Sequence, residues 1–114
     1  MKKIFTLVAV LALALCLAAP SFAAVSQVAA TSADEYTTGL FVEGYGKASF
    51  DIWGTFSGTI TLQKSYDGTN YLDVGTYTAP IIGERILESS RGGAYWRLYV
   101  TTLASGTANI RVEN

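Results

Sequence analysis

Few residues in this chain carry reactive side chains. The 114 residues include no histidine, and the single cysteine, Cys16, lies in an apolar N-terminal run. Nucleophilic triads therefore lack their histidine base, and the usual zinc ligand sets are missing. Asp51, Asp67 and Asp73 are carboxylates of the type that a glycosidase pairs, but Asp67 suits a turn and the other two suit solvent-facing strand positions. We expect a protein that is not an enzyme and uses no metal or cofactor.

One short segment invites comparison with a cation-binding loop. Asp67-Gly68-Thr69-Asn70 places oxygen-bearing side chains around a glycine, as calcium loops do. No closing bidentate glutamate follows at the required spacing, and Asp-Gly and Asn are typical of tight turns between strands. We therefore interpret the segment as a β-hairpin turn.

Three side chains form the most interesting group for binding. Tyr95, Arg97 and Tyr99 alternate along one expected strand, so they share the outer face of a sheet. Tyrosines on a sheet stack on sugar rings, and arginine donates hydrogen bonds to hydroxyls or carboxylates. Tyrosine and arginine are also enriched at protein interfaces. The third interpretation is cross-strand pairing that stabilises the sheet without any ligand. The sequence leaves all three open.

The first 24 residues have the features of a signal peptide. Lys2 and Lys3 precede an apolar run over 4–19, and small residues follow it. We expect cleavage at Ala23 or Ala24, with export to the periplasm or the medium and membrane contact only during export.

Two other interpretations of this leader, a transmembrane anchor and a lipoprotein signal at Cys16, are weaker. The apolar run is shorter than the roughly 20 residues of a membrane span. Cys16 follows Leu15, whereas lipoprotein signals carry Gly, Ala or Ser before the modified cysteine.

The charge of the remaining chain limits its partners. Without Lys2 and Lys3, six lysines and arginines stand against nine acids, a net charge of −3. This balance argues against nucleic acid as a partner, because binding phosphates requires clustered cations. No cysteine remains for a disulfide, so the stability of this small chain must come from its apolar core or from a homo-oligomer.

After the leader, apolar and polar residues alternate with a period of two, which is typical of half-buried strands. The expected inward residues are Phe50, Ile52, Ile60, Leu62, Val74, Trp96, Leu98, Val100, Ile110 and Val112. The pattern predicts seven strands, at 40–43, 47–53, 59–65, 71–77, 85–88, 95–101 and 108–113, with turns at 54–58 and 103–106.

This pattern predicts an all-β chain, a single small antiparallel β-sandwich after a signal-like N-terminal helix. The sandwich domain covers 39–114 and is preceded by an N-terminal arm or edge strand over 25–38. Its type is Ig-like or jelly-roll-like. An Ig identity would draw on a Cys–Trp–Cys arrangement, which the chain lacks.

Four segments resemble small β-sandwich virion proteins of tailed bacteriophages. Residues 54–68 read GTFSGTITLQKSYDG and residues 70–78 read NYLDVGTYT, similar to the "TLQ-[KR]-S", Asp-Gly turn and "V-x-x-Y-T" run of these proteins. Residues 95–100 (YWRLYV) and 105–112 (SGTANIRV) are similar to their closing strands. The likeness covers 39–114.

The resemblance implies a capsid decoration or cement protein, or a head–tail accessory, that binds a capsid or tail lattice through a sheet face or edge and is located in the virion. The arm at 25–38 is available as an added strand. The leader departs from the pattern: either the chain is a relative used in the cell envelope, or the leader is retained and serves assembly. The alternative is a secreted or periplasmic carbohydrate-binding module that uses Tyr95, Arg97 and Tyr99.

Overall fold

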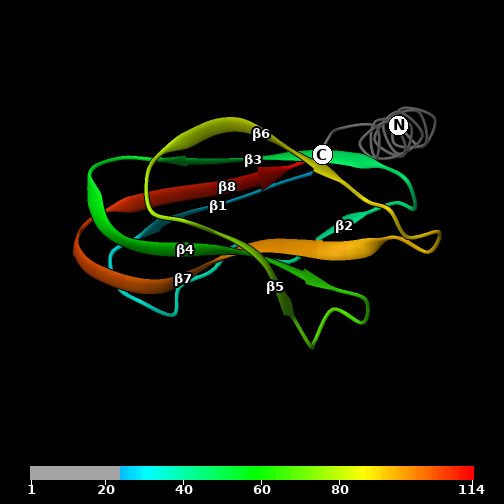
Figure 1. Ribbon diagram of the computed structural model, residues 1–114, viewed down its shortest axis with the longest axis horizontal. Helices are drawn as coiled ribbons and strands as arrows, with labels where there is room; N and C mark the ends of the chain where they lie inside the picture. The colour runs from blue at the N-terminus through cyan, green and yellow to red at the C-terminus, as the bar shows by residue number, and fades with distance from the viewer. Residues whose placement is uncertain (1–23) are drawn as a thin grey trace, which may run out of the picture.

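The structure is a computed structural model that describes residues 24–114 (Figure 1). The expected signal-like helix and the expected cleavage position Ala23 lie outside the described residues. Over 24–114 the chain is all-β, with eight strands in two antiparallel sheets. This described part contains no helix that is long and apolar enough to cross a membrane.

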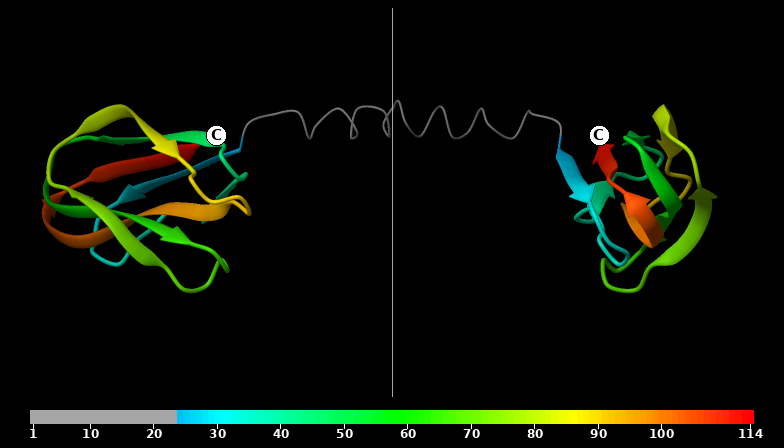
Figure 2. Two further views of the ribbon diagram at one scale, coloured as in Figure 1. Left: turned by 45° about the vertical axis from the view of Figure 1, so that its right-hand side comes forward. Right: turned by 90° about the vertical axis from the view of Figure 1, so that its left-hand side faces the viewer.

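The strands divide equally between the two sheets. Sheet A has the order β1 (Val25–Ala30), β8 (Ala108–Glu113), β3 (Lys47–Trp53) and β6 (Ile81–Leu87). Sheet B has the order β2 (Leu40–Val42), β7 (Ala94–Gly106), β4 (Phe56–Ser65) and β5 (Leu72–Tyr77). The pairing is nested, because β1 pairs with β8, β2 with β7, β3 with β6 and β4 with β5. Figure 2 shows β1 and β6 at opposite edges of sheet A.

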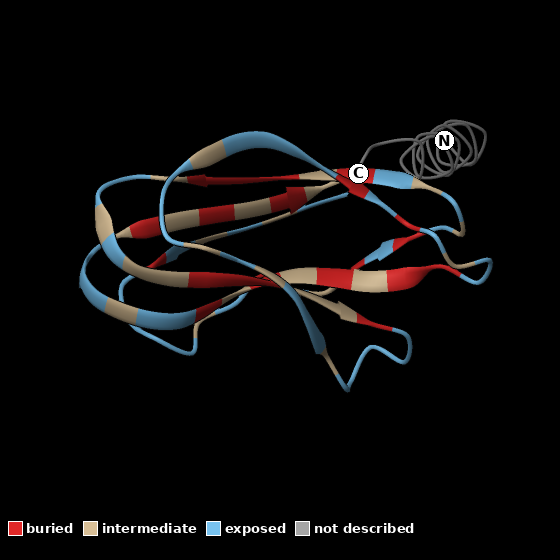
Figure 3. Ribbon diagram, viewed as in Figure 1, coloured by how far each residue is buried: buried red, intermediate tan, exposed pale blue. Residues whose placement is uncertain are grey.

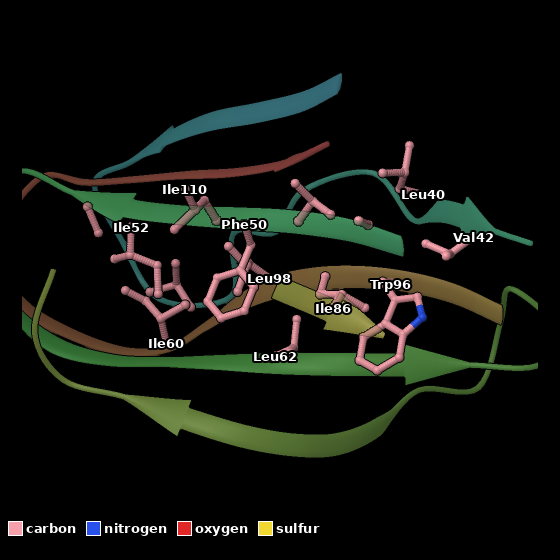
Figure 4. Close-up of a cluster of buried hydrophobic side chains, with 14 of the residues drawn as sticks. Leu40, Val42, Phe50, Ile52, Ile60, Leu62, Ile86, Trp96, Leu98 and Ile110 are labelled. Atoms are coloured by element: carbon pink, nitrogen blue, oxygen red, sulfur yellow. The ribbon is translucent and has the colours of Figure 1, made fainter. Parts of the chain in front are cut away.

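The core lies between the two sheets and is built from alternate residues of their strands (Figure 3). Phe50 and Ile52 of sheet A face Ile60 and Leu98 of sheet B (Figure 4), and all four are fully buried. Nine of the ten side chains expected to point inward are buried. The exception is Val74, which is 54% exposed. It lies on the edge strand β5, where a register shift in the β4–β5 pairing interrupts the alternation.

The strands are longer than the sequence pattern predicted. β4 begins at Phe56 and β7 continues to Gly106, so the turns expected at 54–58 and 103–106 are largely strand. The beginning of β4 pairs with the end of β7, and the register of this pairing shifts twice. The pairing keeps these Thr-, Ser- and Gly-rich segments extended although their apolar–polar alternation is weak. β6 begins at Ile81, directly after Pro80, rather than at Arg85. With β1, the sandwich has eight strands rather than seven.

The segment expected as an arm or edge strand has two parts. Val25–Ala30 is β1, which pairs with β8 of the same chain at the edge of sheet A. The chain then crosses to sheet B, where the N–H groups of Asp34 and Thr37 donate to carbonyls of β7. The carboxylate of Glu35 accepts the N–H groups of Thr31 and Ser32, which fixes the crossing turn. This crossing places Tyr36 beside Tyr99 of β7.

Candidate functional site

Strand β7 places the three predicted binding residues on the outer face of sheet B. Trp96 and Leu98 point into the core and are buried, whereas Tyr95, Arg97 and Tyr99 between and beside them are partly exposed. The predicted alternation along this strand is therefore confirmed. The structure adds Tyr36 from the β1–β2 crossing and Tyr71 from the β4–β5 hairpin. We call Tyr36, Tyr71, Tyr95, Arg97 and Tyr99 the tyrosine–arginine cluster.

Arg97 occupies the centre of this cluster. Its guanidinium carbon lies 3.7 Å from the ring centroid of Tyr71, 4.4 Å from that of Tyr36 and 5.3 Å from that of Tyr99. The Arg97 Nε donates a 2.8 Å hydrogen bond to Oε1 of Gln63, whose Nε2 donates to Asp73. Cation–π attraction and this hydrogen-bonded chain hold the guanidinium in one orientation.

Tyr99 and Tyr36 form the second part of the cluster. Their rings are nearly parallel, with centroids 5.8 Å apart. The Tyr99 hydroxyl donates a 2.5 Å hydrogen bond to Oδ1 of Asp34. This hydrogen bond to a carboxylate, together with partial burial, raises the pKa of the Tyr99 phenol. Tyr36 itself is 51% exposed, so the cluster presents an aromatic surface to solvent.

The hairpin turn supports the cluster from the other side. Asp67 accepts the N–H groups of Asn70 and Thr69, each at 2.8 Å, which holds the pKa of its carboxyl well below the usual range. The expected turn is confirmed, and Gly68 in it has a φ of +78°. A side chain at Gly68 would contact the Tyr95 ring, which lies edge-on against Phe41 with centroids 5.2 Å apart. The turn chemistry therefore determines how closely the hairpin approaches β7.

A buried carboxylate at the end of the sandwich is structural. Glu88 has a fully buried side chain that pairs with the Lys64 ammonium at 2.7 Å and accepts the Trp96 indole N–H at 2.9 Å. Burial by itself raises the pKa of Glu88, but the hydrogen bonds from Lys64, the Ser90 N–H and Trp96 together lower it to about 2. A general acid at neutral pH needs a raised pKa and access to substrate. Glu88 has neither.

The expectation that Asp51 faces solvent is wrong. Its side chain is buried, with Oδ1 accepting the Gly83 N–H at 2.6 Å and Oδ2 accepting two N–H groups of Arg111 at 3.0 and 2.7 Å. The β3–β6 register shifts at this residue, and β6 thereby brings the Gly83 N–H to the carboxylate. Asp73 is exposed as expected, although it accepts a hydrogen bond from Gln63. Within residues 24–114, no three His, Cys, Asp or Glu side chains gather as a metal site.

Sequence reasoning missed two members of the cluster. Tyr36 lies in a segment with weak patterning, and Tyr71 stands at the start of a strand, so neither signals an outer-face site. Their positions follow from the crossing that runs beside β7 and from the hairpin that folds onto it. Comparisons with known proteins found no matching family model, no similar curated protein and no similar solved structure.

Proposed function

We propose that this chain is a non-enzymatic jelly-roll protein that docks onto a larger protein assembly through the outer face of sheet B, in the manner of virion decoration or accessory proteins. The observation that carries the proposal is the tyrosine–arginine cluster, a partly exposed aromatic surface packed around Arg97. The partner surface is a capsid or tail lattice.

The strand order supports the jelly-roll assignment. Two four-stranded sheets with the first strand paired to the last and the second to the seventh form the nested arrangement of a jelly roll. In an Ig sandwich the first strand pairs with the second in one sheet. Capsid domains and lectins share the jelly roll, so the topology agrees with the virion resemblance without choosing among its members.

The construction of the cluster supports protein docking. Tyrosine and arginine dominate binding energy at interfaces, where they lie near the centre of the contact. Ordering a long side chain on binding costs about 0.5–1.5 kcal/mol, and Arg97 is already ordered by three rings and Gln63. Phe41, 45% exposed, extends the apolar surface beyond Tyr95. A partner surface meets this face with little further loss of side-chain freedom.

A glycan site at Tyr95, Arg97 and Tyr99 receives less support. A sugar ring stacks on an open aromatic face, and the guanidinium of Arg97 already lies over the rings of Tyr36 and Tyr71. Tyr95 packs edge-on against Phe41, and Gly68 of the hairpin turn lies close to its ring, so less of that ring is open than its place on the outer face suggests. We therefore do not propose these three residues as a sugar-stacking surface.

Co-sedimentation with particles from the native source tests the docking proposal. We expect the wild-type protein to pellet with purified particles in stoichiometric amount. Tyr36→Asn is expected to weaken this association roughly tenfold, the loss of one interface hot spot. Intact mass spectrometry of the pelleted form also reports whether residues 1–24 are retained.

Tyr45→Asn is the matched control, because Tyr45 is 68% exposed in a turn outside the cluster and its φ of +57° suits asparagine. We expect this variant to pellet like the wild type. Absence of the protein from purified particles would overturn the proposal. Equal binding by Tyr36→Asn and the wild type would exclude the cluster as the docking surface.

A further inference from the structure

Strand β1 has one long edge without a partner strand. It is the outermost strand of sheet A and pairs only with β8 (Figure 2). The Asn114 N–H donates to the Ala24 carbonyl, and in an antiparallel pair every second residue bonds to the neighbouring strand. The residues between these direct their backbone N–H and C=O groups away from β8, and they are Val25, Gln27 and Ala29. Among residues 24–114, no backbone group outside β8 bonds to them.

The other edges of the sandwich carry features that hinder strand addition. β2 has three residues, and β5 and β6 each contain a register shift. Charged residues lie on both of the shifted strands, Asp73 on β5 and Glu84 and Arg85 on β6. Short strands, bulges and charges are the means by which proteins protect sheet edges from pairing. β1 has none of these: its six residues are uncharged, include no proline or glycine, and pair with β8 without a shift.

The sequence of β1 is complementary to itself. A two-fold axis perpendicular to sheet A pairs two copies of β1 antiparallel and keeps every side chain on its own face of the sheet. With the axis at Gln27, all three free residues of each copy enter the pairing. The Gln27 amide, a donor and an acceptor, then meets its own copy, and Val25, 55% exposed, lies opposite the partner's Ala29. On the inner face, Ser26 lies opposite the partner's Val28.

Charge does not oppose this pairing. The charged side chains nearest to β1 on the outer face are Arg111 and Glu113, which lie on β8 beside Gln27 and Val25. They have opposite signs and pair with each other at 3.7 Å. Two copies therefore meet at β1 without like charges directly opposite one another, which is the arrangement that destabilises cross-strand pairs.

We propose that two copies of this chain associate through β1 and join their four-stranded sheets A into one continuous sheet. The occupant of the free edge is thus a second copy of the chain, and the two β1 strands pair in the register centred on Gln27. A chain of this size without disulfides gains stability from such an association. The pairing uses the edge of sheet A and does not depend on docking through sheet B.

This dimer has a consequence for docking, which rests on the proposed function. A rotation about an axis perpendicular to sheet A leaves the direction of each sheet face unchanged. The outer faces of the two sheets B, and with them the two tyrosine–arginine clusters, therefore point the same way. One dimer presents two docking surfaces to one lattice, and its attachment is strengthened by effective concentration without any new contact.

Sedimentation velocity tests the association, using protein produced from the full sequence in the form that cells accumulate. Over roughly 1 µM to 1 mM we expect a monomer–dimer equilibrium with a dissociation constant on the order of 10–100 µM. The dimer is weak because a pair of six-residue strands is smaller than the roughly 1,200 Å² of a standard interface. A protein that stays monomeric over this whole range would overturn the proposal.

Gln27→Lys tests the edge, because it places like charges opposite each other at the axis. We expect this variant to weaken the dimer about fivefold. Thr76→Lys is the matched control, since Thr76 is exposed on the edge strand β5 and the change in net charge is the same. It is expected to stay within about twofold of the wild type at 0.15 M salt. Equal weakening by the two variants would exclude β1 as the interface.

Cysteine cross-linking in a Cys16→Ala background tests the register. In the proposed pairing the Cα atoms of residue 27 in the two copies lie about 5.5 Å apart, within the range of a disulfide. Gln27→Cys is therefore expected to form a covalent dimer on mild oxidation. Ala29→Cys is not, because its copy lies four residues further along the paired strand, about 13 Å away. Cross-linking of Ala29→Cys as fast as Gln27→Cys, or of neither variant, would overturn the proposed pairing.

Discussion

Replacing Glu88 by glutamine is expected to remove a pH-dependent part of the folding free energy. The buried carboxylate accepts hydrogen bonds from the Lys64 ammonium, the Ser90 N–H and the Trp96 indole. These bonds lower its pKa from 4.5 to about 2 against the opposing effect of burial. At 1.36 kcal/mol for each pKa unit, the lowering corresponds to a stabilisation on the order of 3 kcal/mol.

The direction of the pH dependence follows from the lowered pKa. The stabilisation is fully present above the unfolded pKa of 4.5 and is lost as the pH falls toward the folded pKa of about 2. Glutamine has a similar size and keeps an acceptor for the Trp96 N–H, but it carries no charge for Lys64. The free energy of unfolding of Glu88→Gln is therefore expected to be about 3 kcal/mol lower than that of the wild type at pH 7. The difference should close as the pH approaches 2.

Urea denaturation at intervals between pH 7 and pH 2.5, followed by tryptophan fluorescence, measures this difference. Glu84→Gln on the exposed part of β6 is the control, and we expect it to stay within about 0.5 kcal/mol of the wild type at pH 7. If the free energies of unfolding of Glu88→Gln and the wild type differ by the same amount at every pH, the predicted role of the Glu88 charge is wrong. The effect would then come from packing rather than from the charge.

Two further predictions concern the core and the backbone. Leu98 is fully buried in β7, and Leu98→Ala is expected to lower the free energy of unfolding by about 3 kcal/mol. Urea denaturation measures this loss, and a value below about 1 kcal/mol would contradict the core packing. Gly106→Ala is expected to lower the melting temperature more than Gly83→Ala does. Both glycines have a positive φ, but of the two only Gly106 would place the added methyl against backbone, at the Thr55 carbonyl. Equal melting temperatures for the two glycine variants would show that this backbone contact carries no cost.

The alternation of residues was enough to predict most strands and which face of each is buried. In β3, β7 and β8 the apolar residues recur at every second position, and the structure buries them as expected. The prediction was wrong where pairing changes the register. Val74 and Asp51 both lie at register shifts, so Val74 is exposed and Asp51 is buried. A single strand's sequence does not contain the position of a bulge, because the bulge depends on the neighbouring strand.

The candidate site was only partly visible in the sequence. The two-residue period put Tyr95, Arg97 and Tyr99 on one face, but it did not supply the groups that surround Arg97. Tyr36 and Tyr71 reach Arg97 from other segments of the chain.

By itself the sequence determined the all-β class, the hairpin turn at Asp67 and the inward faces of the main strands, since period-two burial and turn chemistry are local properties. Only the tertiary structure decided the nested strand order, the extension of β4 and β7 through polar segments, and the burial of Asp51 and Glu88. These depend on which strands become neighbours. That choice minimises exposed apolar surface and unpaired backbone groups over the whole chain rather than within any one segment.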